Sequence, residues 1–162
     1  MSLYYLSAGS NMGDRMGYLR GASEELSRRG VSIIRKSSVY ETDPWGKTDQ
    51  PCFLNAVLTA RWDGTAEALL QVMLSVEAVF GRRRLVHWGP RTLDLDLLYG
   101  EGLSEETPFL TLPHPYFWER LFVLVPLAEV APDFAWHGEL VEKRIEALGG
   151  RASVRLREDL KW

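Results

Sequence analysis

The 162-residue sequence has little of several features that mark specialised classes of protein. It has one cysteine, Cys52, so no disulfide can form within the chain, and a reducing compartment is expected. Its longest hydrophobic run, residues 121–127, contains Pro126 and is far shorter than the roughly 20 residues of a membrane-spanning helix. The N-terminus lacks the basic lead and long apolar stretch of a secretory signal. We therefore expect a cytoplasmic protein without a membrane segment.

Positive and negative charges are also nearly balanced, with 19 Lys and Arg against 22 Asp and Glu residues. The formal net charge is -3 and the sequence pI is near 5.7, whereas nonspecific nucleic-acid binding usually needs a broad basic face. No nucleic-acid partner is therefore expected. With 46% hydrophobic residues, the chain can build the core of one domain, residues 1–162, and we expect a monomer.

The pattern of apolar residues predicts a particular order of strands and helices. Strands are expected at 3–8, 31–40, 53–62 and 93–99, and helices between Asp14 and Gly30 and between Thr65 and Gly81. This βαββαβ order is typical of the ferredoxin-like α+β fold, in which helices pack on an antiparallel sheet. Residues 42–51 are expected to form an irregular loop. The C-terminal additions should include helices near 121–130 and 140–148.

Asp94 and Asp96 lie two residues apart in an apolar stretch. Alternate side chains of a strand leave the same face about 6 to 7 Å apart, and two carboxylates at that separation repel by roughly 2 to 3 kcal/mol at an effective dielectric near 20. A positive group should lie between them. One interpretation is Mg²⁺, which binds carboxylates together with substrate phosphates and water. The alternative is an arginine, such as Arg84 or Arg91.

The segment just before this pair is strongly basic. Residues 82–91 contain four arginines and no acidic residue, with His87 and Trp88 among them. Arginine keeps its charge and fits phosphate oxygens with a planar fork, so the segment can be read as a polyphosphate clamp. A solvated basic loop after a helix is the simpler interpretation. The adjacent acidic pair favours the clamp, because a phosphate bound through cations needs both signs of charge in one site.

Several sequence blocks together carry a family resemblance. They are residues 7–13 (SAGSNMG), 38–46 (SVYETDPWG), 53–56 (FLNA), 81–82 (GR), 88–96 (WGPRTLDLD) and 112–115 (LPHP), with Arg120 and Phe122. The chain resembles the 6-hydroxymethyl-7,8-dihydropterin pyrophosphokinase family of folate biosynthesis. The resemblance extends to about residue 132.

The resemblance implies transfer of pyrophosphate from ATP to the hydroxymethyl group of 6-hydroxymethyl-7,8-dihydropterin, with release of AMP. It implies two Mg²⁺ ions at Asp94 and Asp96, and catalytic roles for Arg82 and Arg91 in stabilising the transferred charge. The residues that it implies for ATP binding are Glu77, Arg82, Arg84, Arg91, Thr111, His114 and Arg120. Without the family, His114 would be a structural histidine between prolines, and Arg120 an ordinary surface charge.

The resemblance also implies a pterin site. Phe53 and Phe122 would stack on the ring and Asn55 would bind its edge, as suits a flat heterocycle with polar edges. The residues implied for pterin binding are Thr42, Pro44, Trp45, Phe53, Asn55, Trp88 and Phe122. Without the family, both phenylalanines would be assigned to the core. Phe53 and Leu74 stand where many relatives have tyrosine and glutamine.

Two other functions are compatible with the residues. A two-metal phosphohydrolase would use the same aspartates, with water as the attacking group. A ferredoxin-like binding module would use the basic segment to hold a nucleotide or nucleic acid without turnover. Dependence of AMP formation on added pterin distinguishes both from the pyrophosphokinase.

Overall fold

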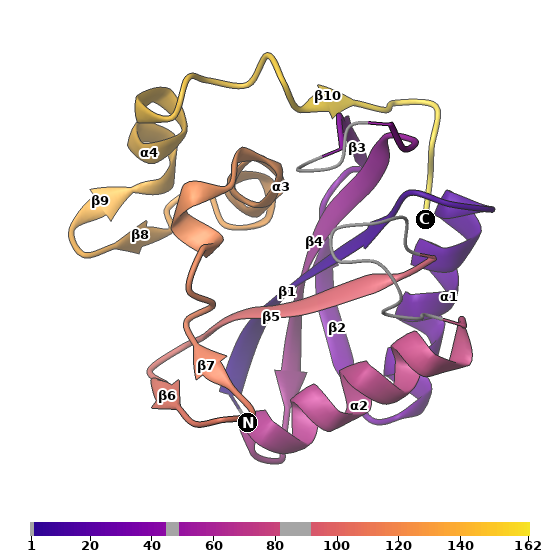
Figure 1. The fold of residues 1–162 in the computed structure, drawn as a ribbon. Helices are drawn as coiled ribbons and strands as arrows, with labels where there is room; N and C mark the ends of the chain where they lie inside the picture. Colours follow the sequence, from indigo (N-terminus) through magenta and orange to yellow (C-terminus); the bar gives the residue numbers. More distant parts are fainter. Residues whose placement is uncertain (1, 45–48, 82–91) are drawn as a thin grey trace.

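A six-stranded antiparallel sheet runs through the centre of the molecule (Figure 1). The structure is a computed structural model that describes residues 2–44, 49–81 and 92–162. The strands are β1 (Ser2–Ser10), β2 (Ser32–Lys36), β3 (Tyr40–Thr42), β4 (Phe53–Trp62), β5 (Asp94–Gly100), β6 (Glu105–Glu106), β7 (Thr111–Leu112), β8 (Ala135–Trp136), β9 (Glu139–Leu140) and β10 (Arg155–Leu156). The helices are α1 (Arg15–Arg28), α2 (Ala66–Val79), the 3₁₀ turn η1 (Phe117–Glu119), α3 (Leu121–Val130) and α4 (Val141–Ala147).

Strands β1 to β5 and helices α1 and α2 form the predicted ferredoxin-like core. The sheet order is β10-β3-β4-β1-β5, with β2 also paired to β4. The central strand β1 pairs antiparallel with β4 on one side and β5 on the other. Helices α1 and α2 lie on one side of this sheet, and α3 and α4 lie on the other (Figure 1). The prediction of an α+β fold is confirmed.

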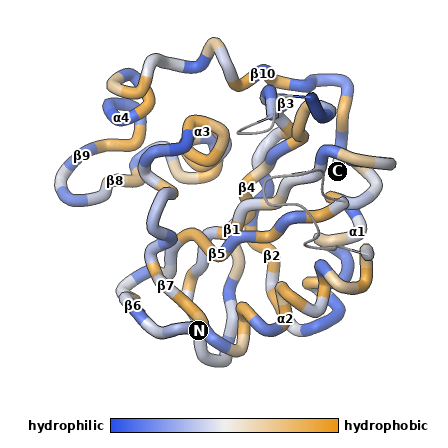
Figure 2. Tube along the Cα trace, in the orientation of Figure 1, coloured by the Kyte–Doolittle hydropathy of each residue, from blue (hydrophilic) through white to orange (hydrophobic). Residues whose placement is uncertain are grey.

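The ends of α1 and α2 follow from local capping chemistry. The side chain of Asp14 accepts a hydrogen bond from the Gly17 amide, and Thr65 accepts one from the Ala68 amide, as expected of N-cap residues. Hydrophobic and hydrophilic residues alternate along α2 in Figure 2, because one face of the helix packs on the sheet. Leu19, Leu69 and Leu95 belong to the core between these helices and the sheet.

The prediction of a single strand at 31–40 is wrong in one respect, because the structure has two strands there, β2 and β3. At the break, Ser37 bonds to β4 through its backbone and its hydroxyl, which accepts a hydrogen bond from the Val57 amide. The Ser38 amide instead donates to the carboxylate of Glu129, at the end of α3. At this point the Ser38 amide therefore has a side chain of a distant helix as its hydrogen-bond partner, in place of a neighbouring strand.

A second core lies on the other face of the sheet. It contains Phe117, Trp118, Leu124 and Leu127, packed over Val57 of β4. Helix α3 continues through Pro126, and its bounds agree with the predicted 121–130; α4 lies within the predicted 140–148. The hairpins β6–β7 and β8–β9 and the edge strand β10 were not predicted. Within the described ranges, no helix has the length and apolar character needed to cross a membrane.

Candidate active site

One row of residues crosses the sheet on the face opposite α1 and α2. Gly9 of β1 lies opposite Asp94 on β5 and opposite Asn55 on β4. Two residues earlier in β1, Ser7 lies opposite Asp96. Directly opposed residues of antiparallel strands present their side chains on the same face, about 4.5 to 5.5 Å apart at Cβ. The register therefore places both aspartates and Asn55 on a common surface, as the Asp-x-Asp spacing predicts for the acidic pair.

Gly9 lies in the middle of this row, where a side chain would meet close neighbours. A Cβ atom at Gly9 would lie 3.1 Å from Oδ1 of Asn55, closer than most side-chain contacts. The Asn55 amide is held in place because its Nδ2 donates a 2.8 Å hydrogen bond to Oγ1 of Thr42. The glycine thus lets the oriented amide oxygen of Asn55 lie close to the backbone of β1.

The aspartates are half-buried at the start of β5, while the alternating residues Leu95 and Leu97 belong to the core under α1 and α2. Over residues 2–44, 49–81 and 92–162, no cluster of three or more His, Cys, Asp or Glu side chains has a metal-binding arrangement. Two carboxylates nevertheless fit Mg²⁺, which is typically bound by one or two protein carboxylates and completed by phosphates and water. The donor set therefore suits a metal that arrives with a phosphate substrate.

Glu77 holds the acidic strand from the opposite face of the sheet. Its side chain comes from α2, is only 3% exposed, and accepts a 2.7 Å hydrogen bond from the backbone amide of Leu95. That amide lies between the two aspartates in sequence. A buried N–H that found no acceptor would be costly, so Glu77 is placed to fix the backbone of the acidic pair. A contact between Glu77 and ATP stays a prediction.

His114 approaches the row from the segment after β7. Its backbone amide donates to the carbonyl of Leu98, and its Nδ1 accepts a 3.2 Å hydrogen bond from the Tyr116 amide. Burial, and next the Arg120 cation, lower the pKa of His114 to about 4 against the opposing effect of Asp94. The imidazole is therefore neutral near pH 7, with its proton on Nε2 because Nδ1 is the acceptor.

Arg120 lies near two aromatic rings at the start of α3. Its guanidinium carbon is 5.5 Å from the ring centre of Tyr116 and 5.6 Å from that of Phe122, within cation–π range. Phe122 and Phe53 are both half-buried, so each packs on the protein and keeps an exposed part. The residues in this part of the molecule thus include a cation, a neutral imidazole and aromatic surface.

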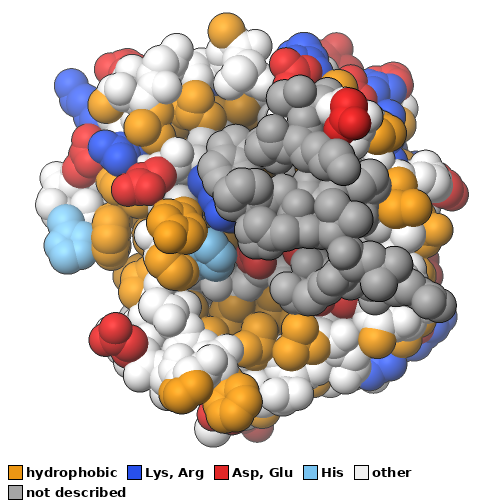
Figure 3. All heavy atoms as spheres, in the orientation of Figure 1, with side chains coloured by type: hydrophobic (Ala, Val, Ile, Leu, Met, Phe, Trp, Pro, Cys, Tyr) orange, Lys and Arg blue, Asp and Glu red, His pale blue; other side chains and the backbone are white. Residues whose placement is uncertain are grey.

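The remaining predicted site residues are placed as follows. Thr42 is not in the irregular loop expected at 42–51: it ends β3, opposite Phe53. Pro44 follows two residues later, and Thr111 is an exposed residue of β7. Histidine, acidic and hydrophobic side chains meet near the middle of this face in Figure 3. The predictions for Arg82, Arg84, Arg91, Trp45 and Trp88 concern residues outside the described ranges.

A family model of 7,8-dihydro-6-hydroxymethylpterin-pyrophosphokinase (HPPK) matches residues 5–132, most of the chain. The chain belongs to this family. A relative from Methylorubrum extorquens, 2-amino-4-hydroxy-6-hydroxymethyldihydropteridine pyrophosphokinase, is 46% identical over 149 residues, which are 91% of this chain and 94% of the relative. The pyrophosphokinase from Bacillus subtilis is 45% identical over 130 residues, covering 80% of this chain and 78% of the relative.

Solved HPPK structures have the same fold. Plasmodium falciparum HPPK-DHPS with pteroate superposes with a TM-score of 0.74 at 14% identity, over 93% of this chain and 43% of the other. HPPK-DHPS in complex with substrates gives a TM-score of 0.71 at 12% identity, over 91% of this chain and 45% of the other. This chain thus spans less than half the length of those solved chains, and at these identities the likeness concerns the fold alone.

Sequence reasoning missed several residues that lie in or next to the candidate site. Ser7 and Gly9 lie in a block that carries the resemblance, and the alternation of small residues with apolar ones along β1 was a usable signal. Arg15, Glu41 and Arg157 form an ion-pair network beside β3. No spacing in the sequence could indicate it, because Glu41 and Arg157 are 116 positions apart.

Proposed function

We propose that this chain transfers the terminal pyrophosphoryl group of ATP to the hydroxymethyl oxygen of 6-hydroxymethyl-7,8-dihydropterin. A bond forms between that oxygen and the β-phosphorus, the bond between the β-phosphorus and the oxygen that bridges it to the α-phosphorus breaks, AMP leaves, and the hydroxyl proton is lost to solvent. The observation that carries the proposal is the placement of Asp94 and Asp96 beside Gly9 on one face of the sheet, in a chain of the pyrophosphokinase family.

Asp94 and Asp96 would hold two Mg²⁺ ions together with the oxygens of ATP. Bound there, the metal would supply charge neutralisation for the attacking and leaving oxygens. The protein's share of such a reaction is largely positioning and electrostatic stabilisation. Glu77 contributes by fixing the Leu95 amide, so the two carboxylates keep their common direction. Arg82 and Arg91 are proposed to stabilise the transferred charge, with Arg84 as a further phosphate contact.

His114, Thr111 and Arg120 are proposed to lie on the nucleotide side. The neutral His114 ring keeps an Nε2–H donor because the Tyr116 amide occupies Nδ1. A neutral donor can bind a phosphate oxygen or the adenosine part of ATP without adding charge. Arg120 has its guanidinium within cation–π range of two aromatic rings, which favours this orientation.

The pterin is proposed to bind next to the row, over β4 and the start of α3. Phe53 and Phe122 would contact its faces with their exposed parts. Oδ1 of Asn55, fixed through Thr42, would accept a hydrogen bond from the pterin edge. Because Gly9, between Asn55 and Asp94, has no side chain, the hydroxymethyl group would approach the acidic pair across the backbone of β1. Pro44, Trp45 and Trp88 complete the proposed pterin residues.

A coupled AMP-release assay with and without the pterin tests this function. We expect AMP release to require ATP, Mg²⁺ and 6-hydroxymethyl-7,8-dihydropterin together, with the pyrophosphorylated pterin formed in equal amount. AMP formed without pterin would favour the phosphohydrolase, and ATP binding without turnover would favour the binding module. The same protein sample, passed over a sizing column, tests the proposed monomer. The cytoplasmic location stays a prediction.

A further inference from the structure

The last eight residues form an arm that closes the edge of the sheet next to the proposed pterin site. The C-terminal arm, residues 155–162, begins with β10, which pairs with β3 through Arg155 opposite Glu41 and Leu156 opposite Tyr40. The Arg157 amide extends the pairing by donating to the carbonyl of Val39. Strand β3 is only three residues long, so β4 and the arm together supply its pairing. The arm lies beyond residues 5–132, the range of the family match.

Ion pairs between side chains also connect the arm to β3, in addition to the short strand pairing. NH1 of Arg157 lies 3.2 Å from Oε2 of Glu41, and NH1 of Arg15 on α1 lies 2.8 Å from the same oxygen. Arg15 also donates to the carbonyl of Cys52, just before β4. Each of the three ionic side chains is less than a third exposed. Such a shared network orders its members better than an isolated surface pair.

The network lies behind Thr42. Side chains alternate along a strand, so Glu41 leaves the face toward α1 while Thr42, its neighbour, leaves the face of the proposed site. Thr42 in turn accepts the 2.8 Å hydrogen bond that orients Asn55. A second ion pair, between Arg155 and Asp43, holds the residue that follows Thr42. The arm thus holds both neighbours of Thr42 in the chain.

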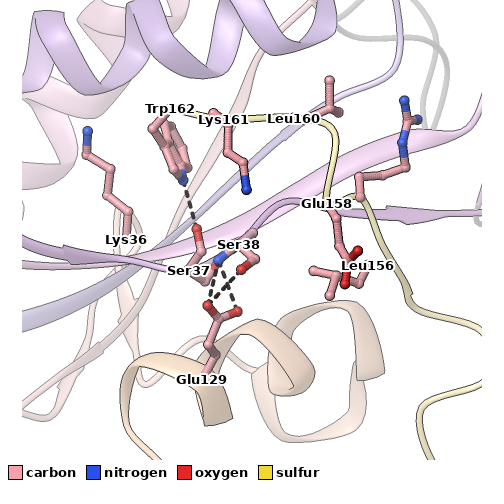
Figure 4. A pocket seen from close by; sticks show the side chains of 10 residues that line it. Lys36, Ser37, Ser38, Glu129, Leu156, Glu158, Leu160, Lys161 and Trp162 are labelled. Atoms are coloured by element: carbon pink, nitrogen blue, oxygen red, sulfur yellow. Dashed lines mark hydrogen bonds between the residues drawn. The ribbon is translucent and has the colours of Figure 1, made fainter.

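The arm is anchored at its far end as well. Nε1 of Trp162 donates a 2.8 Å hydrogen bond to the carbonyl of Ser37, and Lys36 lies over the Trp162 ring (Figure 4). Arg20 on α1 donates to the carbonyl of Lys161. Between the two ends, the arm borders an open cavity of about 630 Å³, whose lining also includes Glu129 (Figure 4). Hydrogen bonds therefore hold the arm at both ends, with this cavity beside it.

We propose that the C-terminal arm is a positioning element for the pterin, acting through the contacts of Arg157 with Glu41 and of β10 with β3 on the hydrogen-bonded pair Thr42–Asn55. This inference rests on the proposed function. It predicts that weakening the arm impairs pterin binding and leaves the nucleotide side unchanged, because Asp94 and His114 belong to other strands and loops. Arg157 touches no substrate in this scheme and is a positioning residue.

The test compares Arg157→Ala, Arg157→Lys and a chain ending at residue 154 with the unchanged protein. Arg28→Ala is the matched control, since it removes an exposed ion pair with Glu25 at the far end of α1. For Arg157→Ala we expect KM for the pterin to rise about threefold to tenfold, with kcat within twofold and KM for ATP unchanged. Arg157→Lys should recover part of the loss, because lysine restores the charge without the fork that spans Glu41 and Asp159.

Hydrogen exchange supplies a measurement that does not depend on turnover. In Arg157→Ala, the amides of residues 40–43 and 53–55 should exchange faster, and those of β5 should not. Unchanged pterin KM overturns the proposal whether or not exchange accelerates, since the arm would then only stabilise the fold. A raised pterin KM with unchanged exchange also overturns it. If the unchanged protein forms no AMP with pterin, the proposed function has failed instead. Thermal unfolding shows whether the chain that ends at residue 154 folds. If it does not fold, the comparison uses Arg157→Ala.

Discussion

The two faces of the sheet use the same strands for different purposes. On the face toward α1 and α2, side chains such as Leu6, Leu58 and Leu95 are at most 5% exposed and form a continuous core. On the other face, apolar residues pack under α3 at one end, while Asp94 and Asn55 flank Gly9 at the other. The face toward α1 and α2 is thus packed throughout, whereas the other face combines a packed end with the residues of the proposed chemistry. Variants in the first core and at the proposed site should separate stability from activity.

The largest expected effect is on catalysis, from the double change Asp94→Ala and Asp96→Ala. Removing both carboxylates should lower kcat/KM by about 10³-fold or more, since the charge of the reacting phosphates would lose its metal. The fold should persist, because the change also removes the repulsion within the pair. AMP release and circular dichroism check the two expectations. Asp63→Ala, in the exposed turn before α2, is the control, and retained turnover in the double variant would contradict the assignment.

The opposite result is expected for Leu69→Ala on the helix face. Leu69 is fully buried, and truncation of a buried leucine typically costs about 2 to 5 kcal/mol of unfolding free energy. The KM values should not change, because the folded fraction keeps its site. Urea unfolding measures the loss. Leu74→Ala, a change of the same kind at a 39% exposed position of the same helix, should alter stability by less than about 0.5 kcal/mol. Equal losses in both variants would show that burial on this face is not the cause.

Much of the helix-bearing face could be predicted from the sequence. The period of apolar residues and the capping residues Asp14 and Thr65 gave both helices, and the strand at 53–62 was placed with its observed bounds. These features depend on neighbours a few positions apart. The break at Ser37–Ser38 and the arm depend on Glu129 and Arg157, which lie some 90 to 120 positions from their partners. Local pattern carries no information about such contacts.

The proposed site was predictable to a different degree. The spacing of Asp94 and Asp96 was sufficient to predict a shared face, because the period of a strand is fixed. Asn55 and His114 were assigned to the site from the family resemblance. Neither the resemblance nor the residue spacing predicted how their side chains are oriented. The structure supplies this orientation through the Thr42 hydroxyl and the Tyr116 amide. Glu77 was associated with ATP, whereas its observed partner is a backbone amide of the acidic strand.

Glu77 connects the two faces, so its variants should affect both properties. Glu77→Ala removes the acceptor of the buried Leu95 amide, which should lower the unfolding free energy by about 1 to 3 kcal/mol. The same change should raise the Mg²⁺ concentration for half-maximal activity, since Asp94 and Asp96 flank that amide. Glu77→Gln keeps an acceptor oxygen and should lose less of each. Urea unfolding measures the unfolding free energy, and Mg²⁺ titration of AMP release measures the half-maximal Mg²⁺ concentration. A loss of stability with unchanged Mg²⁺ dependence would mean that Glu77 stabilises the fold without influencing the acidic pair.

The smallest effect is expected at His114, where the site face contributes a pH-dependent share of stability. Its pKa is lowered to about 4 in the folded protein, from an ordinary value near 6.5, so the unfolded chain takes up the proton first as the pH falls. The stabilisation that the neutral ring confers is therefore present above about pH 6.5 and is lost toward pH 4. Between pH 7 and pH 5 it should amount to about 1 to 2 kcal/mol.

His114→Asn isolates this contribution, because the asparagine Oδ1 can accept the hydrogen bond of the Tyr116 amide and does not titrate. The unfolding free energy of both proteins falls in acid as carboxylates protonate, but the unchanged protein should lose more between pH 7 and pH 5. Equal slopes would mean that the ring is solvated in the folded state. A larger loss in the unchanged protein would mean that the polar end of the site face, too, contributes to stability, although only while His114 is neutral.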